Sequence, residues 1–194
     1  MSEPTVRSRR KAGRRAQLLA AAAELFAVRG YLGVRLEDLG SAVGVSGPAV
    51  YRHFANKESV LVELLVGISE RLLAGGRAAV AGVDSAADQL AALIEFHTEF
   101  AVADSELIRI QDRDLAQLPP DSEHEVRKLQ REYVELWVDV LCRVDSALDV
   151  AEARVKVHAA IGLMNSTPHI ADDSRRRLTV LLASMTSKAL GATC

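Results

Sequence analysis

Hydrophobic residues recur every three to four positions along almost the whole chain, which is the spacing that gives an α-helix one apolar face. Val60, Leu64, Ile68 and Leu72 illustrate the pattern, since each lies four residues after the one before. No segment alternates apolar and polar residues with the β-branched and aromatic enrichment of a strand. The pattern therefore predicts an all-α fold.

Residues that favour helix starts and ends divide this pattern into nine predicted helices. Asn56 is expected to cap the fourth helix, and Gly75, Gly76 and Gly82 are expected to weaken it. The last helix places Leu178, Leu181, Leu182, Met185 and Ala189 on one side. The predicted helices lie at about residues 12–28, 36–43, 47–54, 57–75, 85–102, 105–118, 121–141, 150–165 and 172–190.

Charge is distributed unevenly along the chain. Residues 1–57 carry ten lysines and arginines against four acidic residues, a local charge of +6, whereas residues 58–194 carry fourteen against twenty-two, a local charge of −8. A basic N-terminal part on an acidic body favours a polyanion-binding unit joined to a second module, and a solvated basic tail is the alternative. We therefore expect a basic arm at residues 1–11, a polyanion-binding unit at 12–58 and a second module at 59–194.

Residues 36–54 predict two short helices joined by a tight turn, which is the arrangement of a helix-turn-helix. Gly44 allows the positive φ that such a turn requires, and Ser46 is placed to cap the helix predicted at residues 47–54. The expected apolar anchors of that helix are Val45, Val50 and Phe54. An ordinary three-helix bundle is the alternative, but its exposed face would carry mixed charges rather than cations.

The exposed face of the helix predicted at residues 47–54 combines small residues, an aromatic hydroxyl and cations. Small residues let a helix approach the floor of the major groove, where alanine contacts a thymine methyl group. Arg52 is placed for a bidentate contact with guanine or for a phosphate, while Tyr51, His53 and Lys57 are placed for phosphates. The residues predicted from this pattern to bind DNA are Ser46, Gly47, Pro48, Ala49, Tyr51, Arg52, His53 and Lys57.

Six more basic residues lie just before the first predicted helix and in its first turn: Arg7, Arg9, Arg10, Lys11, Arg14 and Arg15. They have two interpretations. A short basic arm can enter the minor groove beside the helix-turn-helix site. A disordered basic tail can instead attract phosphates without regard to sequence.

The segment GYLGVRLEDLGSAVGVSGPAVYRHFANKESVL resembles the signature of the TetR family of bacterial repressors. The resemblance rests on Tyr51, Phe54, Lys57 and Glu58, and it covers about residues 12–65. Beyond them the chain shares only the general helical character of the family's divergent bodies. The resemblance implies a nine-helix fold with an N-terminal DNA-binding unit and a C-terminal body.

Two positions depart from the family pattern. Arg35 lies where the family usually has Ser or Thr, which caps the helix predicted at residues 36–43 and contacts a phosphate. An arginine can replace the phosphate contact but not the cap, so Arg35 joins the predicted DNA-binding residues. Gly40 replaces a common alanine, which costs up to about 1 kcal/mol in a helix interior.

The resemblance also implies that two chains form a homodimer through their last two helices. Small residues in these helices permit close approach, as a four-helix bundle between two subunits requires, and packing within one chain is the alternative. These residues are Ala153, Ala159, Ala160, Gly162, Ala183, Ser184 and Ala189.

The resemblance further implies a small-molecule effector in the body. The fifth to eighth helices supply apolar side chains and a few polar groups, which suits a hydrophobic ligand, and plain core packing is the alternative. The predicted ligand-binding residues are Phe96, His97, Phe100, Ile110, Tyr133, Trp137, Leu141 and Met164.

Residues 109–120 and the pair Tyr133 and Trp137 also resemble regulators of lipid and acyl-thioester metabolism within the family. That resemblance implies that Arg109, Arg113 or Arg127 meets a phosphate or carboxylate. Salt bridges on the helix surface are the alternative.

Other classes of function lack support in the sequence. The chain has no nucleophile elbow, glycine-rich phosphate loop or HExxH motif, so neither an enzyme nor a metal or other cofactor is predicted. No apolar run reaches the roughly 18 residues of a membrane span, so no membrane partner is predicted. Cys142 and Cys194 lie far apart, which favours a reducing cytoplasm.

Together these features predict a cytoplasmic, homodimeric repressor that binds double-stranded operator DNA. A small hydrophobic effector, with acyl thioesters among the candidate classes, is expected to release it. The alternative is a ligand-binding or interaction protein of the same fold that lacks specific operator binding.

Overall fold

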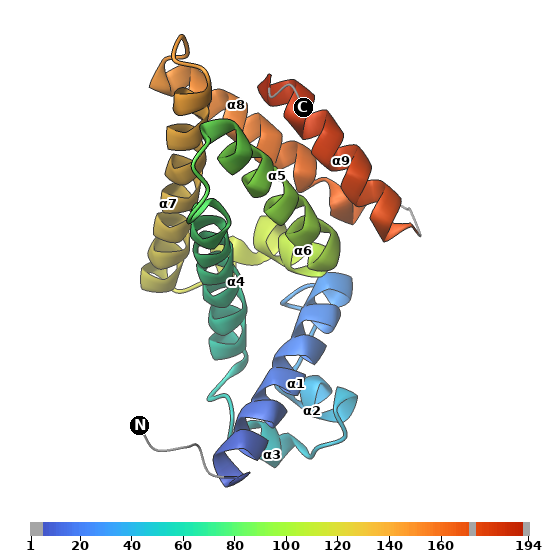
Figure 1. Ribbon diagram of the computed structural model, residues 1–194. Coiled ribbons are helices and arrows are strands. Elements are labelled where there is room, and N and C mark those ends of the chain that lie inside the picture. Colours follow the sequence, from blue (N-terminus) through green and yellow to red (C-terminus); the bar gives the residue numbers. More distant parts are fainter. Residues whose placement is uncertain (1–5, 171–173, 192–194) are drawn as a thin grey trace.

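The computed structural model describes residues 6–170 and 174–191, and every regular element within them is a helix (Figure 1). A small N-terminal unit consists of α1 (Val6–Arg29), α2 (Leu36–Ala42) and α3 (Gly47–Val50). The long helix α4 (Lys57–Val80) leads from this unit into the body. The body comprises α5 (Ala86–Ala103), α6 (Ser105–Asp114), α7 (Pro120–Val144), α8 (Val150–Met164) and α9 (Arg175–Leu190). The all-α class and the nine α-helices predicted from the sequence are therefore confirmed for the described residues.

The predicted start of α1 and the predicted end of α6 differ from the structure, and the predicted start of the last helix cannot be compared with it. Helix α1 begins at Val6 rather than near residue 12, so residues 6–11 of the expected arm are helical, while residues 1–5 lie outside the described part. Helix α6 ends at Asp114, and a 3₁₀ turn at Leu115–Gln117 follows it. The predicted start of the last helix, Asp172, lies outside the described residues.

Helix α3 is shorter than the predicted 47–54. The chain nevertheless continues to coil after Val50, because the Val50 carbonyl accepts hydrogen bonds from the amides of His53 at 2.8 Å and Phe54 at 3.0 Å. Arg52 and His53 therefore lie in a turn that continues the direction of α3.

Gly75 and Gly76 do not end α4, which continues to Val80. A Cβ atom at Gly75 would overlap the Phe96 ring of α5, and one at Gly76 would lie 2.6 Å from Cε2 of Tyr133 on α7. The two glycines thus let aromatic rings from two neighbouring helices pack directly on the α4 backbone. This packing offsets the low helix propensity that led us to expect a weak point here.

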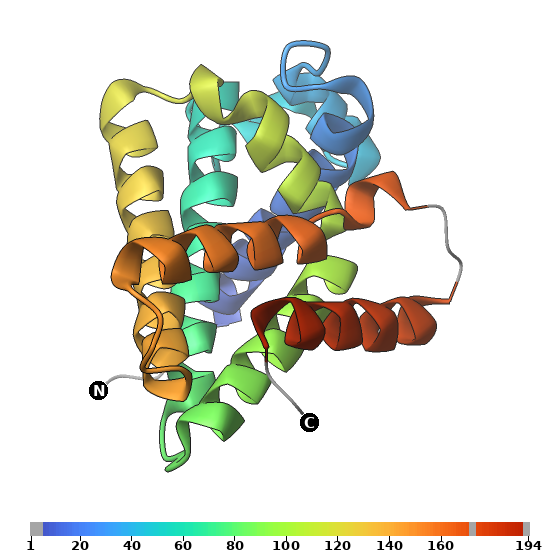
Figure 2. The ribbon, with the colours of Figure 1, turned by 90° about the horizontal axis from the view of Figure 1, so that it is seen from above.

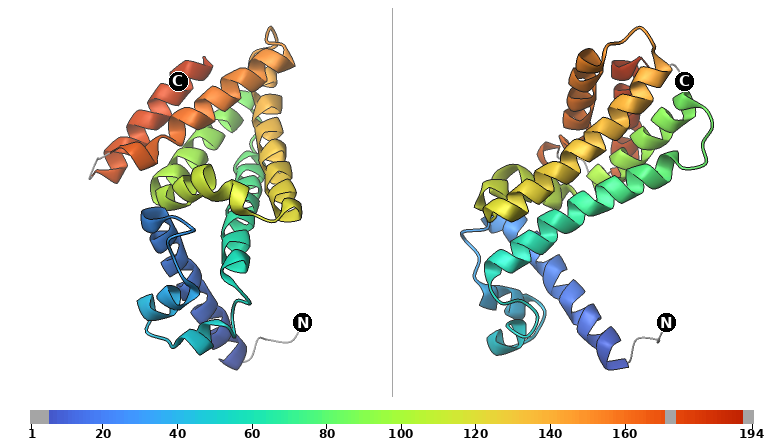
Figure 3. Two further views of the ribbon diagram at one scale, coloured as in Figure 1. Left: turned by 180° about the vertical axis from the view of Figure 1, so that it is seen from behind. Right: turned by 90° about the vertical axis from the view of Figure 1, so that its left-hand side faces the viewer.

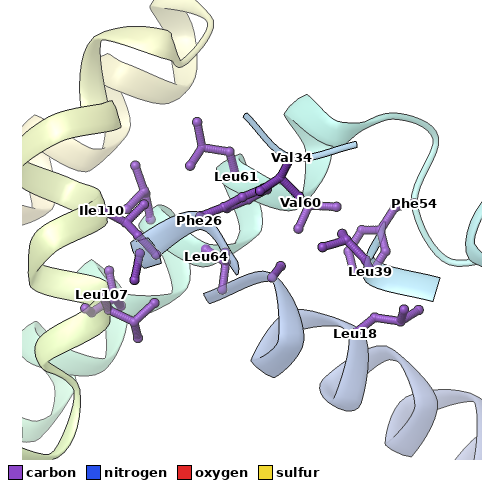
Figure 4. Close-up of a cluster of buried hydrophobic side chains, with 14 of the residues drawn as sticks. Leu18, Phe26, Val34, Leu39, Phe54, Val60, Leu61, Leu64, Leu107 and Ile110 are labelled. Carbon is purple, nitrogen blue, oxygen red and sulfur yellow. The ribbon is translucent and has the colours of Figure 1, made fainter. Parts of the chain in front are cut away.

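One apolar core extends from the N-terminal unit into the body. Phe26 of α1 is fully buried and lies between the α2 side of the unit and two residues of α6, Leu107 and Ile110 (Figure 4). Leu61 and Leu64 of α4 complete this contact. The end of α1 and the helix α6 are therefore packed against each other.

Helices α8 and α9 lie side by side and form an outer layer of the body (Figures 2 and 3). Behind them a second core surrounds Trp137, which is fully buried among residues of α5, α7 and α8. The outer layer therefore presents one face to this core and leaves the opposite face open.

Candidate nucleic-acid interface and ligand cavity

The turn between α2 and α3 is built around two glycines. Gly44 has a φ of 70°, and the Val45 amide donates to the Gly40 carbonyl at 2.9 Å while the Gly44 amide donates to Ser41 at 3.3 Å, which together form a Schellman motif. A Cβ atom at Gly40 would lie 2.9 Å from the Val45 carbonyl oxygen and 2.8 Å from Val50. Gly40 is therefore required by the close approach of α3, which its low helix propensity alone did not indicate.

The caps of α2 and α3 differ in part from expectation. The Arg35 side chain makes no capping bond, but the Asp38 carboxylate accepts from the Arg35 amide at 2.8 Å and stabilises the start of α2 from within. Ser46 occupies the N-cap position of α3, yet its hydroxyl accepts no capping bond. The start of α3 instead relies on the fixed φ of Pro48.

The α3 region has the buried and exposed faces that a reading helix needs. Val50 is fully buried and Phe54 is 2% exposed, so these two anchors are confirmed, while Val45 is half-buried. The predicted DNA-binding residues divide into exposed and half-buried groups. Arg35, Ser46, Pro48, Tyr51 and Arg52 are exposed, whereas Gly47, Ala49, His53 and Lys57 are half-buried.

An acidic residue of α2 contacts this exposed face. The Tyr51 hydroxyl donates to the Glu37 carboxylate at 3.1 Å, and this hydrogen bond raises the pKa of Tyr51 above its usual value. The Glu37 side chain also lies against Gly47, where a Cβ atom would meet its Cγ at 3.2 Å. Tyr51 is therefore engaged with a carboxylate of α2.

His53 lies where the positive charges of α1 and of the α3 region converge. Burial lowers the pKa of His53, and Lys11, Arg15, Arg14 and Arg52 lower it further in that order. The imidazole is therefore favoured in its neutral form, which can donate one hydrogen bond to a phosphate. The same convergence makes the start of α1 and the end of α3 one basic surface.

Lys57 makes contacts within the protein in addition to the phosphate contact that stays a prediction for it. Its ammonium group donates to the carbonyls of Tyr31 at 2.7 Å and Val34 at 2.8 Å, and it lies 4.2 Å from the centre of the Tyr31 ring. These three contacts hold the start of α4 to the loop between α1 and α2. Both carbonyls were far from Lys57 in sequence, so the sequence pattern did not reveal them.

The basic residues of α1 divide into two groups. Arg15 forms an ion pair with Glu63 of α4, donates to the His53 carbonyl and lies over the Phe54 ring, so it joins three elements. Arg9, Arg10 and Lys11 are exposed on the first turns of the helix. A helical extension of α1 thus takes the place of part of the extended arm that we considered.

The body contains a cavity of about 460 Å³ that is open to solvent on one side and lined by residues of α4, α5, α6, α7 and α8. Of the eight predicted ligand-binding residues, His97 and Tyr133 line it. The other six pack outside its lining: Trp137, Leu141 and Met164 in the second core, Ile110 in the first, Phe96 on Gly75, and Phe100 beside the first core. The apolar periodicity identified the right helices but mainly their core faces.

His97 forms the polar centre of the cavity wall. Its Nδ1 lies 3.0 Å from the Tyr133 hydroxyl and its Nε2 lies 3.0 Å from the Asn165 side-chain oxygen. Since that oxygen can only accept, Nε2 carries the proton and Nδ1 accepts from Tyr133. Burial lowers the pKa of His97 to about 4 and raises that of Tyr133 well above its usual value, so both groups are neutral near pH 7.

Several polar residues of the cavity were absent from the predicted set. Gln111, Asp112, Gln130 and His158 line it from the polar sides of α6, α7 and α8. Burial raises the pKa of Asp112 above its usual value. The clustering of such residues at 109–113 and 127–131 was a signal for these positions, but a search for apolar stripes passes over it.

The three arginines considered for an anionic ligand have different surroundings. Arg127 lines the cavity and pairs with Glu123 on its own helix at 2.8 Å, as the salt-bridge alternative expects. Arg109 donates to the Pro168 carbonyl at 2.5 Å. Arg113 lines the cavity, pairs with Asp114 and also donates to the carbonyls of Phe26 and Ala27 in α1.

The open face of α8 and α9 is unusually apolar. Val155 is 69% exposed, Val180 65% and Leu181 53%, and Met185 is exposed beside them. The small residues Ala159, Gly162, Ser184 and Ala189 are exposed on the same two helices, whereas Ala153 and Ala160 are buried. An apolar surface of this kind is typical of a protein–protein contact.

Neither a membrane span nor a metal cluster is found in the described part of the chain. No helix there is both long enough and apolar enough to cross a bilayer. Residues 6–170 and 174–191 also contain no group of three or more histidine, cysteine or acidic side chains placed to hold a metal ion.

Comparison with known proteins covers both parts of the fold. The family model described as "Bacterial regulatory proteins, tetR family" matches residues 18–64, and the one described as "Tetracyclin repressor-like, C-terminal domain" matches residues 83–169. The first match contains α2, the turn and α3. The second contains most of the helices that enclose the cavity.

Individual relatives agree with these matches. The HTH-type transcriptional repressor KstR2 of Rhodococcus jostii is 35% identical over 133 residues, which are 68% of this chain and 65% of the repressor. The HTH-type transcriptional activator FasR of Mycolicibacterium smegmatis is 29% identical over 78% of this chain and 67% of its own length. This chain therefore spans about two thirds of the relatives it matches.

A solved structure shows the same fold at low identity. AibR, crystallised in complex with isovaleryl coenzyme A and operator DNA, superposes with a TM-score of 0.74 and 16% identity over 89% of this chain and 97% of AibR.

Proposed function

This chain belongs to the TetR family of bacterial regulatory proteins, and we propose that it is a homodimeric, ligand-responsive repressor that binds operator DNA. Each subunit places α3 and the turn after it in the major groove of one half-site. A small effector in the cavity of the body favours a state with lower affinity for DNA. Residues 12–58 form the DNA-binding unit and residues 59–194 the ligand-binding and dimerisation body.

The observation that carries this proposal is the construction of the α2–turn–α3 segment. Its apolar residues Val50 and Phe54 are buried, while Pro48, Tyr51 and Arg52 project from the same short segment to the surface. The small residues Gly47 and Ala49 leave room beside them for the edges of the bases. Arg52 has the donor geometry for a guanine, and the basic surface at the start of α1 supplies phosphate contacts.

The effector is proposed to be a small, mainly apolar molecule with one polar or anionic end, such as an acyl thioester. The cavity supports this choice because leucine, isoleucine and valine side chains share its lining with His97, Asn165 and two arginines. AibR, a relative in fold, was crystallised with isovaleryl coenzyme A. The homodimer is proposed to form through the open faces of α8 and α9.

A gel-shift titration tests operator binding. The DNA is a duplex carrying the promoter of the protein's own gene, and a scrambled duplex of the same composition is the competitor. We expect a specific shift with the promoter duplex. Arg52→Ala should weaken operator binding by about 1–3 kcal/mol and relax specificity at one base pair of the half-site. Arg10→Gln should weaken the binding of both duplexes equally. Isovaleryl and octanoyl coenzyme A should release the complex.

Two results would contradict the proposal. Equal affinity for the promoter and the scrambled duplex, unaffected by Arg52→Ala, would favour a ligand-binding protein of the same fold that does not recognise an operator. Transcription that falls, rather than rises, when the gene is deleted would identify an activator instead of a repressor.

A further inference from the structure

Arg113, in the last turn of α6, belongs to the cavity and to the contact with α1 at the same time. We propose that Arg113 binds the anionic group of the effector and that this binding draws its guanidinium away from α1, which releases the DNA-binding unit. The inference rests on the ligand-responsive function proposed above. It predicts that the ligand carries a carboxylate or phosphate, and that Arg113 couples ligand binding to the position of α1.

On the α1 side, Arg113 acts as a cap supplied by another helix. Its Nη2 donates to the Phe26 carbonyl and its Nη1 to the Ala27 carbonyl at 3.4 Å. The Phe26 carbonyl already accepts from the Gly30 amide at 2.9 Å, so Arg113 adds a second donor to it. The C-terminal end of a helix carries partial negative charge, so a cation there stabilises the helix end. The guanidinium also lies within 4 Å of the point where a Cβ atom of Gly30, the residue after α1, would stand.

On the cavity side, the same guanidinium is suited to an anion. It pairs with the buried Asp114 at 2.9 Å, which holds the charge at the edge of the cavity. Arg127 faces the same space from α7. Asp112 is the acidic side chain among the lining residues, while Asp114 and Glu123 pair with the two arginines from outside the lining. A guanidinium binds a carboxylate or phosphate through two parallel hydrogen bonds.

Competition follows from the small number of donors on one side chain. Nη1 and Nη2 supply the bonds to α1, and Nη2 also binds Asp114. Since Nε also donates to Asp114, four of the five N–H groups are engaged, and a bidentate anion in the cavity has to displace at least one of these bonds. Ligand binding and α1 binding therefore favour different positions of Arg113, which is the difference between two states that allosteric coupling requires.

The packing around Arg113 extends this change to the reading helix. Leu107 and Ile110 of α6 lie against Phe26 at the end of α1 (Figure 4). Near the middle of α1, Arg15 donates to the His53 carbonyl in the turn after α3. A shift of α1 is thus transmitted through direct contacts to the residues proposed to meet DNA.

The test compares octanoate with 1-octanol, which has the same chain length and no charge. Isothermal titration calorimetry measures the binding of each probe to the full-length protein. Hydrogen exchange measures the amides of Phe26–Gly30. We expect octanoate to bind more tightly than 1-octanol and to speed exchange in this turn about fivefold or more, while 1-octanol leaves it unchanged.

Three variants separate the two roles. Arg113→Gln should lose octanoate affinity and show fast exchange with or without the probe. Arg113→Lys keeps the charge for Asp114 and the anion but lacks the fork, so it should bind octanoate while exchange at α1 no longer responds. Arg109→Gln, one turn earlier on α6 and bound to Pro168 instead of α1, should behave like the unchanged protein.

Failure to bind octanoate, or an exchange response that survives in Arg113→Lys, would overturn the inference. These measurements use no DNA, so they are independent of the gel shift. A protein that recognises its operator but whose α1 turn does not respond to octanoate would disprove the role of Arg113 and leave the proposed DNA binding intact.

Discussion

Gly40 lies where α2 closely approaches the turn before α3 and Val50 at the end of α3. Helix propensity alone predicts that Gly40→Ala stabilises the protein by up to about 1 kcal/mol. A Cβ atom there would stand 2.9 Å from the Val45 carbonyl oxygen and 2.8 Å from Val50, neither of which is the end of a flexible side chain. We therefore expect Gly40→Ala to lower the free energy of unfolding in urea by about 1–3 kcal/mol.

Gly67 is the matched control for this prediction, because it lies inside α4 with nothing within 4 Å of its would-be Cβ atom. Gly67→Ala should raise the free energy of unfolding by up to about 1 kcal/mol. Stabilisation by both substitutions would show that α3 can move away from α2 at little cost.

His97 is expected to make the stability of the body depend on pH. Its pKa is about 4 in the folded protein, whereas an unfolded histidine has a pKa near 6.5. Between these values the unfolded chain binds more protons, so stability is full above pH 6.5 and falls as the pH drops towards 4, by an amount on the order of 3 kcal/mol. Urea unfolding followed by the fluorescence of the single tryptophan, Trp137, measures this loss.

The variant His97→Gln isolates this contribution from the carboxylates that titrate in the same range. The loss of stability between pH 7 and pH 4 should be smaller in His97→Gln than in the unchanged protein by about that amount. His124→Gln, at an exposed position of α7, should leave the loss as it is. Identical pH profiles for all three proteins would show that His97 takes up its proton without opening the core.

Single residues differ in how far the sequence predicted them. The burial of Val50 and Phe54 follows from helical spacing, which is a local property. The roles of Lys57 and Arg15 do not, because their partners Tyr31 and Glu63 lie 26 and 48 residues away. A cation that is bound inside the molecule and one that is exposed for DNA look alike in the sequence.

The pair α2 and α3 presents an acidic residue next to the surface proposed for DNA. The Glu37 carboxylate holds the Tyr51 hydroxyl, and both side chains are exposed. A DNA phosphate near Tyr51 has to displace or oppose this carboxylate. We expect Glu37→Gln to tighten the binding of operator and scrambled duplexes alike, by a few-fold at low salt, because it removes one like charge from the interface. Fluorescence anisotropy at several salt concentrations measures both affinities.

Glu106→Gln removes the same charge from an exposed position of α6 in the body and should leave both affinities nearly unchanged. Weaker binding by Glu37→Gln would mean that the carboxylate is needed to orient Tyr51 on DNA, and the hydrogen bond would then be part of the reading surface.

At the scale of elements, the sequence predicted the helices better than their contacts. The apolar period located all nine, since it depends on residues within two turns of each other. Gly75 and Gly76 were wrongly expected to weaken the helix, because the aromatic rings that pack on them come from α5 and α7 and lie far away in the sequence. Most of the residues that the period predicted for the cavity lie in the core instead, because a core face and a cavity face have the same period.

At the scale of the whole molecule, part of the apolar surface of the helices is exposed. The predicted stripe of the last helix was broad, and the structure divides it. Leu178 and Leu182 pack inward, whereas Leu181 and Met185 are exposed. The sequence thus contained the open face, but only the position of α9 on the body shows which residues belong to it.

The exposed apolar face of α8 and α9 is expected to hold two chains together. Adding charge at its centre, in the double variant Val155→Glu and Leu181→Glu, should convert a dimer into a monomer in sedimentation velocity, since four like charges would meet in a symmetric interface. Because the two reading heads would then bind independently, affinity for a two-site operator should fall to that for one half-site. Leu32→Glu is the control, as Leu32 is 77% exposed outside these helices, and it should remain a dimer. A double variant that still sediments as a dimer would place the interface on another surface and remove α8 and α9 from the proposed assembly.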